Sequence, residues 1–159
     1  QMSYWIKSIG ATRSPLDDEW LTEENIGVGG LSSSPRLAER VHFPLKKRPS
    51  SIVIGDRFLL YGITAIGGRI IGAGIFKSEV RKEDRKEELD LRGTQDVAEW
   101  PWRIDIEMLI SAWHAEKGPT IEAIGWVPTD MSQHSHRHLT EQEYRDGVTA
   151  LAGVALPPA

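Results

Sequence analysis

Short apolar runs, rich in β-branched residues and glycine, alternate with polar residues through the middle of the chain. This alternation predicts strands, because it places apolar side chains on one face of a sheet. Six strands are expected, spanning Ser3 to Ser8, Ile52 to Tyr61, Arg69 to Lys77, Trp102 to Ile110, Ile121 to Val127 and His136 to Leu139. Gly67 and Gly68 favour a tight turn, so the second and third strands are expected to form an antiparallel hairpin.

Two helices are expected, one within about Pro15 to Thr22 and one at the C-terminus. Thr140 is the expected N-cap of the second helix, and Glu143 stands three residues on, where its side chain reaches back to the cap. Apolar residues then recur at helical spacing, at Tyr144, Val148, Leu151 and Ala155. Six strands and few helices predict an α+β fold, a curled β-barrel with flanking helices.

A charge run between two predicted strands carries like charges four residues apart, such as Arg81 with Arg85 and Glu83 with Glu87. Like charges at this spacing destabilise a helix. The segment from Glu79 to Thr94 is therefore expected to be a solvated, mobile excursion.

With 159 residues, of which 40% are hydrophobic, the chain is expected to form one domain over residues 1–159. It has no cysteine, which excludes a disulfide framework, a zinc ribbon and thiol catalysis. No apolar run approaches the roughly 20 residues that a membrane helix needs, so no membrane partner is expected and the cytoplasm is the expected location.

The formal net charge of −4 argues against a protein that holds long nucleic acid by charge alone, so any nucleic-acid contact is expected to be local. One basic patch surrounds a short apolar triplet and is a candidate for backbone contact. It consists of Arg36, Arg40, Lys46, Lys47 and Arg48. The alternative interpretation is an exposed solubilising loop that ends at Pro49.

Motifs of catalysis and cofactor binding are missing from the sequence. There is no nucleophile elbow, no phosphate-binding loop and no dinucleotide fingerprint, and no cofactor is predicted. Three histidines, His134, His136 and His138, share one face of a predicted strand. Neighbours on such a face lie about 6.6 Å apart, which is wide for three ligands of one ion, so a polar strand edge is the preferred interpretation.

Tryptophan is abundant, with six residues among twelve aromatic ones. Its broad ring suits stacking on a base or enclosing a methyl group. Core packing is the simpler explanation for Trp5, Trp113 and Trp126. Trp100 and Trp102 flank Pro101 at the start of a strand, where a core role and a pocket role are equally open.

Six segments in order resemble the EVE family of the PUA-like superfamily, which is related to the YTH domains that read methylated adenine in RNA. They are Tyr4 to Ser8, Gly27-Val28, Gly55 to Tyr61, Ile71 to Gly74, Trp102 to Ile106, and Ser135 to Thr140 with Glu143-Tyr144. The resemblance implies a PUA-like barrel with flanking helices, and a pocket that accepts a flipped or unpaired modified base.

Carried over by position, the resemblance implies a ligand-binding set of Trp5, Lys7, Ser8, Tyr61, Trp100, Trp102 and Ser135. Lys7 and Ser8 would lie at the rim, Trp100 or Trp102 would form a cage wall, and Arg137 would meet phosphate. In the family a Trp commonly precedes the Gly-Val pair by two residues, whereas Asn25 stands there in this chain. Trp20 is a candidate for the missing wall, and Asn25 is a candidate for hydrogen bonding to a base edge.

The leading hypothesis is a non-catalytic module that extrudes and cages a methylated or hydroxymethylated cytosine, or a methylated adenine, in DNA or RNA. A separate nuclease or restriction component is a partner class that this hypothesis implies. One alternative is a hydrolase of the ASCH type, although the Gly-x-Lys-x-x-Glu-x-Arg run of that group is missing here. The other is an interaction module with a vestigial pocket, for which Asn25 is the hint.

Overall fold

The computed structural model describes residues 2–10, 26–27, 30–31, 40–83, 86, 89–90, 93–112 and 114–154. Several predictions from the sequence fall outside these residues. They are the helix within Pro15 to Thr22 and the side chains of Trp20, Asn25, Arg36 and Trp113.

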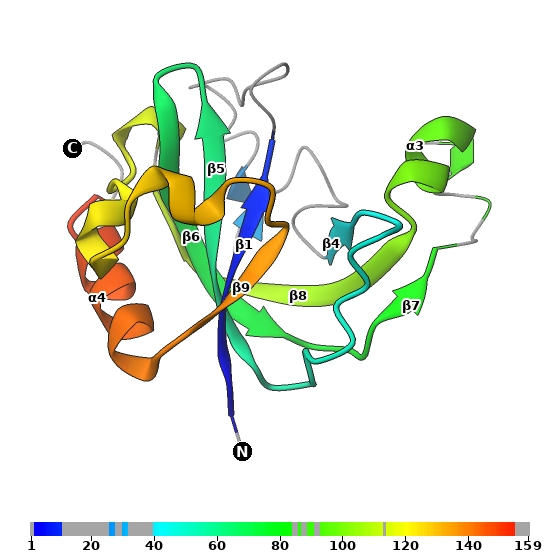
Figure 1. Cartoon of the computed structure of the whole chain (residues 1–159), viewed down its shortest axis with the longest axis horizontal. Coiled ribbons are helices and arrows are strands. Elements are labelled where there is room, and N and C mark those ends of the chain that lie inside the picture. The colour runs from blue at the N-terminus through cyan, green and yellow to red at the C-terminus, as the bar shows by residue number, and fades with distance from the viewer. Residues whose placement is uncertain are drawn as a thin grey trace.

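One main sheet dominates the described chain (Figure 1). Six strands follow one another in the order β4 (Arg40–Phe43), β8 (Trp102–Ser111), β6 (Gly67–Phe76), β5 (Arg57–Thr64), β1 (Tyr4–Ile9) and β9 (His136–Leu139). A further strand, β7 (Arg81–Lys82), pairs with β8, while β2 (Ile26–Gly27) and β3 (Gly30–Leu31) form a separate pair. β1 and β5 run parallel, and the other pairs are antiparallel.

The sheet curls until its two outermost strands face each other. Phe43 on β4 and His136 on β9 stand at opposite ends of the strand order, yet their ring centroids are 5.2 Å apart. Close packing along β6 supports this curl, because a Cβ at Gly74 would lie 2.3 Å from the Glu107 carbonyl oxygen and 2.6 Å from the Phe58 ring. With its helices, the sheet forms an α+β curled half-barrel, which confirms the predicted fold class.

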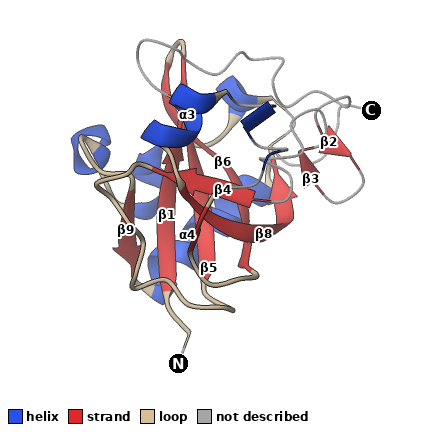
Figure 2. Ribbon diagram, turned by 90° about the vertical axis from the view of Figure 1, so that its right-hand side faces the viewer, coloured by secondary structure: helices blue, strands red, loops and turns tan. Residues whose placement is uncertain are grey.

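The C-terminal helix covers one face of β1 and β5. The helices are α3 (Thr94–Glu99) and α4 (Glu141–Ala152), with 3-10 turns η2 (Ala115–Lys117), η3 (Ile121–Ile124) and η4 (Pro128–Met131). α4 packs its Tyr144 ring 5.0 Å from Tyr4 and its Gly147 against Leu59. In Figure 2 this helix lies behind the strands. Alternation along β1 therefore leaves Trp5 and Lys7 on the opposite face, which looks into the curl.

The strand expected over Ile121 to Val127 is wrong. Ile121 to Ile124 form the 3-10 turn η3, and the two isoleucines are buried three residues apart, which is the spacing of one helical turn. The sequence reading also missed β4, because its four residues include two basic side chains and were taken for part of a charged surface.

The antiparallel hairpin of β5 and β6 is confirmed, but its turn residues differ from the predicted pair. Thr64 pairs with Gly67, so Ala65 and Ile66 form the turn, and both glycines belong to β6. Gly67 has φ +119°, and a Cβ at Gly68 would lie 1.9 Å from the Tyr61 hydroxyl oxygen. The glycines thus provide positive φ and room for an aromatic ring beside the turn.

The described residues between Glu79 and Thr94 include a strand and a buried carboxylate, contrary to the expected mobile excursion. Arg81 and Lys82 form β7, and Glu83 is buried with its carboxylate 2.9 Å from the Arg103 guanidinium. The like charges along this segment disfavour a helix, but they do not prevent Arg81 and Lys82 from pairing with β8 as a strand. Within the described residues, no helix is long and apolar enough to cross a membrane.

The start of α4 follows the sequence prediction in atomic detail. The Thr140 hydroxyl accepts a hydrogen bond from the Glu143 backbone N–H at 3.1 Å, and the Glu143 carboxylate accepts one from the Thr140 N–H at 2.8 Å. This reciprocal pair satisfies two backbone donors that the first turn of a helix leaves unpaired.

Thr140→Ala is expected to lower the free energy of unfolding by about 1 kcal/mol, because it removes the cap acceptor. Thr149→Ala, an exposed position within the same helix, is the matched control and is expected to change stability by less than about 0.5 kcal/mol. Urea denaturation followed by circular dichroism measures both values. An equal decrease in the free energy of unfolding in the two variants would contradict the role of the cap.

Candidate functional site

Asp56 fixes the orientation of Trp5. Its carboxylate accepts hydrogen bonds from the Trp5 indole N–H at 2.9 Å, the Ser3 backbone N–H at 2.9 Å and the Val53 backbone N–H at 3.1 Å. The indole donor is therefore already used, and the Trp5 ring offers only its faces. One of these lies 3.7 Å from the His138 ring centroid in a stacked arrangement.

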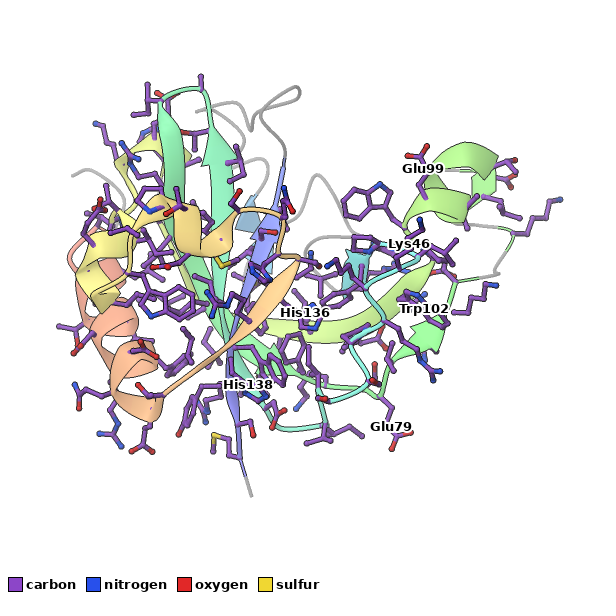
Figure 3. All side chains as sticks on the ribbon, in the orientation of Figure 1. Lys46, Glu79, Glu99, Trp102, His136 and His138 are labelled. Atoms are coloured by element: carbon purple, nitrogen blue, oxygen red, sulfur yellow. The ribbon has the colours of Figure 1, made fainter. Side chains whose placement is uncertain are left out.

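A row of rings crosses the inside of the curl, and we call it the aromatic cluster. It consists of Trp5, Phe43, Trp102, His136 and His138. Phe43 is directly paired with Trp102, so the two side chains share one face of the sheet, and His136 bridges Phe43 at 5.2 Å and Trp5 at 5.6 Å. Figure 3 shows Trp102 on the side of β4 and β8, with His136 and His138 on the side of β9.

Lys7 lies beneath this row. Its side chain is 2% exposed, its ammonium nitrogen is 4.7 Å from the centroid of the Phe43 ring, and it donates to the Ser8 carbonyl oxygen at 2.6 Å. Burial lowers the pKa of Lys7 to about 7, because a charged ammonium loses its hydration there. The prediction placed Lys7 at a pocket rim, whereas the structure buries it inside the curl.

His136 is the cross-strand partner of Lys7. Burial lowers the pKa of His136 to about 4, and the nearby positive charges of Lys7 and Lys47 lower it further. The imidazole is therefore neutral at pH 7, with one nitrogen that donates and one that accepts. Its Nδ1 is buried and has no hydrogen-bond partner among the described residues, so it retains capacity for a ligand.

Three predicted cations stand beside the cluster, on the loop that follows β4. Lys46, Lys47 and Arg48 are exposed, and the Arg48 guanidinium lies 4.9 Å from the Trp102 ring centroid. The Trp102 indole N–H donates to the Leu45 carbonyl oxygen at 2.9 Å. Trp102 thus joins the loop to the cluster, and the Arg48 guanidinium lies over its ring.

Other predicted residues lie elsewhere. Arg40 is only 6% exposed on β4 and is not part of the exposed cationic surface. Tyr61 is buried against Gly68, beside the turn of the hairpin. Trp100 is 39% exposed just after α3. In Figure 3 the neighbouring Glu99 lies farther from His136 and Trp102 than Lys46 does.

The polar residues that the resemblance places near the ligand, Ser8, Ser135 and Arg137, are not members of the aromatic cluster. The Ser8 hydroxyl donates to the carbonyl oxygens of His134 and Ser135, which ties β1 to the segment before β9. Ser135 is buried, and its hydroxyl has no partner among the described residues. Arg137 pairs with Ile6 across the strands and stacks 4.9 Å from the Trp126 ring centroid, so it lies on the face opposite to His136.

Sequence reasoning missed Phe43 as a site residue, and it interpreted the histidines as a polar strand edge or, less favourably, as metal ligands. Alternation along β1 and β9 does place Trp5, Lys7, His136 and His138 on one face once the two strands are paired. Among the described residues, no group of three metal-ligating side chains is arranged to hold an ion. The histidines instead belong to the stacked row.

A shallow surface depression lies at the His138 end of the cluster. It is open to solvent and is lined by Met2, Ser3, Tyr4, His138, Leu139 and Glu141. Neither Trp100 nor Trp102 lines it. The accessible rings of the cluster are His138, which is exposed, and Trp102 and His136, which are partly exposed.

The fold and this site define an α+β curled half-barrel with an aromatic interior that contains a buried lysine. No family model and no curated protein matches the sequence. The structure is similar to a hypothetical protein from Leishmania major, at 10% identity over 96% of each chain and a TM-score of 0.50. It also resembles protein PSPTO5229 from Pseudomonas syringae, at 13% identity over 92% of this chain and 98% of that one, with a TM-score of 0.52.

A third similar structure is protein Atu2648 from Agrobacterium tumefaciens. The identity is 14%, the match covers 98% of this chain and 97% of that one, and the TM-score is 0.51. At such low identity these likenesses concern the fold alone. They extend over nearly the whole chain in each case.

Lys7→Met is expected to stabilise the protein at pH 7 by on the order of 1 to 4 kcal/mol, because it removes a buried amine whose charged form is poorly solvated. The pKa of Lys7 falls from 10.5 in the unfolded chain to about 7 in the folded one. Between these values the unfolded wild type binds more protons, so its stability rises with pH. The advantage of the variant is thus largest below pH 7 and shrinks towards pH 10.5.

Urea denaturation of both proteins between pH 6 and 10 measures this difference. Lys77→Met, at an exposed lysine, is the matched control and is expected to shift stability by less than about 0.5 kcal/mol at every pH. A constant offset between Lys7→Met and wild type across the range would contradict the depressed pKa.

His136→Phe is expected to flatten the acid side of the stability profile. The pKa of His136 is lowered from 6.5 to about 4, so the unfolded wild type binds more protons in that interval and stability falls as pH drops through it. Phenylalanine retains a ring against Phe43 but cannot be protonated. Thermal melting at pH 6.5, 5.5 and 4.5 compares the variant with His134→Phe, whose position is exposed, and an unchanged slope in both would refute the assignment.

Proposed function

We propose that this chain is a non-catalytic module that recognises a modified base in DNA or RNA after the base has left its stack. The observation that carries the proposal is the aromatic cluster with a neutral imidazole in it, whose buried Nδ1 is without a partner among the described residues. A site of this composition suits a flat, weakly polar, uncharged ligand.

The ring surfaces supply stacking, and each base stacked on an aromatic side chain contributes about 1–3 kcal/mol. Trp102 and His136 are partly exposed at the two sides of the curl, with Phe43 buried between them. A methyl or hydroxymethyl group gains further from contact with apolar ring faces. Stacking of this size offsets the few kcal/mol that extrusion costs.

Hydrogen bonding to the base edge comes from His136. Its free Nδ1 can accept or donate, according to the tautomer. Lys7 lies next to it, and its pKa of about 7 allows this amine to gain or lose a proton at little cost near neutral pH. The pair can thereby match either a carbonyl oxygen or a ring nitrogen of a base.

Lys46, Lys47 and Arg48 provide phosphate contacts beside the cluster. Three contacts predict a shallow salt dependence, with the logarithm of the binding constant falling by about 2 to 3 per logarithm of salt concentration. This agrees with a protein of net charge −4, which binds nucleic acid locally. The same residues Lys7 and Trp102 carry part of the resemblance to the EVE family, and a separate nuclease remains the partner class that the proposal implies.

Trp102→Ala is expected to weaken binding of the modified base by at least tenfold while the protein stays folded, because stacking and the anchored loop are both lost. Tryptophan fluorescence is titrated with short single-stranded and duplex DNA and RNA. Each oligonucleotide carries one 5-methylcytosine, 5-hydroxymethylcytosine or N6-methyladenine, or no modification, at fixed moderate salt.

Trp126→Ala is the matched control, since Trp126 packs against Arg137 on the other face of β9. Trp100→Ala tests the second predicted wall. Saturable quenching by one modified base supports the proposal, and lost binding in Trp102→Ala alone assigns Trp102 to the site. No response of the wild type to any oligonucleotide would rule out the reader function.

A further inference from the structure

Leu45 presents an apolar side chain to solvent from a fixed backbone. The side chain is 51% exposed at the turn after β4. Its backbone N–H donates to the Glu99 carbonyl oxygen at 3.0 Å, and its carbonyl oxygen accepts from the Trp102 indole N–H at 2.9 Å. Both backbone groups are thus used in holding the residue at this place.

The loop around Leu45 is closed by its own hydrogen bonds. The Lys47 N–H donates to the Pro44 carbonyl oxygen at 2.9 Å, and the Ser50 N–H donates to the Arg48 carbonyl oxygen at 2.9 Å. Arg48 also rests on the Trp102 ring, at 4.9 Å from the centroid. The loop therefore holds its shape while Leu45 projects from it.

The charges beside Leu45 indicate what covers it. The three residues that follow it are Lys46, Lys47 and Arg48, all exposed. An apolar tip that is followed in the chain by three exposed cations complements a polyanion with an apolar interior. The stacked bases of a duplex, between two rows of phosphates, have these properties.

We propose that Leu45 is a wedge that enters the base stack of a double-stranded nucleic acid at the step from which the recognised base is removed. This inference rests on the proposed function. Extrusion leaves a gap between base pairs, and apolar side chains such as leucine occupy such gaps in proteins that unstack DNA. Filling the gap offsets part of the cost of unstacking.

The position of Leu45 fits this role. Its carbonyl oxygen is bound by Trp102, which belongs to the aromatic cluster, so the wedge and the base-binding rings are connected by one hydrogen bond. Lys47, two residues from Leu45, is close enough to His136 to lower the pKa of that imidazole. Leu45, Lys47 and the cluster residues Trp102 and His136 are thus near neighbours. The partner that can contact all of them is a duplex.

The test compares Leu45→Ala with wild type on matched probes. Each probe is a short duplex with one 5-methylcytosine, 5-hydroxymethylcytosine or N6-methyladenine and a neighbouring 2-aminopurine, and the same modified strand alone is the single-stranded probe. Leu45→Ala is expected to bind the duplex about tenfold more weakly, with unchanged affinity for the single strand. The rise in 2-aminopurine fluorescence on binding is expected to shrink in parallel.

Two further variants serve as controls. Leu45→Met retains an apolar side chain of similar volume and is expected to keep duplex binding within about twofold. Val53→Ala removes another side chain that is 51% exposed and is expected to change neither affinity. Thermal melting confirms that each variant is folded. Both positions are exposed, so the substitutions are expected to leave the melting temperature nearly unchanged.

The outcomes separate this inference from the proposed function. If the wild type binds a modified single strand, while Leu45→Ala weakens duplex and single strand equally or weakens neither, the reader stands and the wedge is refuted. If the wild type binds none of the probes, both are refuted. Selective loss on the duplex supports both.

Discussion

The contact between the two ends of the sheet closes the curl and buries the side chains inside it. Phe43 and His136 come from the first and last strands in the sheet order, and their rings meet at 5.2 Å. An open sheet would leave each of them on an unpaired edge, and Lys7 would be in water. Closure instead buries Lys7 and lowers its pKa to about 7. The unusual chemistry of the site is therefore a consequence of sheet curvature.

Curvature in turn depends on small residues at defined positions. Gly72 lies under the Met108 side chain and Gly74 under the Phe58 ring, where a Cβ would come within 2.4 Å and 2.6 Å of them. The register shift between Ala73 and Gly74 adds a local irregularity at the same point. Bulges and glycines of this kind bend strands and allow a sheet to curl.

Alternation and capping signals were sufficient to predict much of the fold, because they depend on near neighbours. The helix cap at Thr140, the β5–β6 hairpin and the α+β class all followed from such local patterns. β4 was missed, since four residues beginning with an arginine carry little periodic signal. The isoleucines at 121 and 124 were misassigned, because a short apolar run does not distinguish a strand from a helical turn. At the site, pairing of β1 with β9 follows from neither strand alone, so the meeting of Lys7, Phe43 and His136 was beyond prediction.

The burial of Lys7 is costly, and the described residues give it no carboxylate partner to offset that cost. Its ammonium group contacts the Ser8 carbonyl oxygen and the Phe43 ring. A methionine of similar length would fill the same space without a charge to desolvate. Ionised networks elsewhere in the chain are paired, as Arg103 is with Glu83 and Asp105. Groups with strongly shifted pKa values gather at functional sites, where the shift serves the chemistry. The buried amine has no carboxylate partner and lies beside an imidazole whose Nδ1 has no partner among the described residues. These two groups therefore favour the inside of the curl, over the paired charges of β7 and β8, as the location of the proposed ligand site.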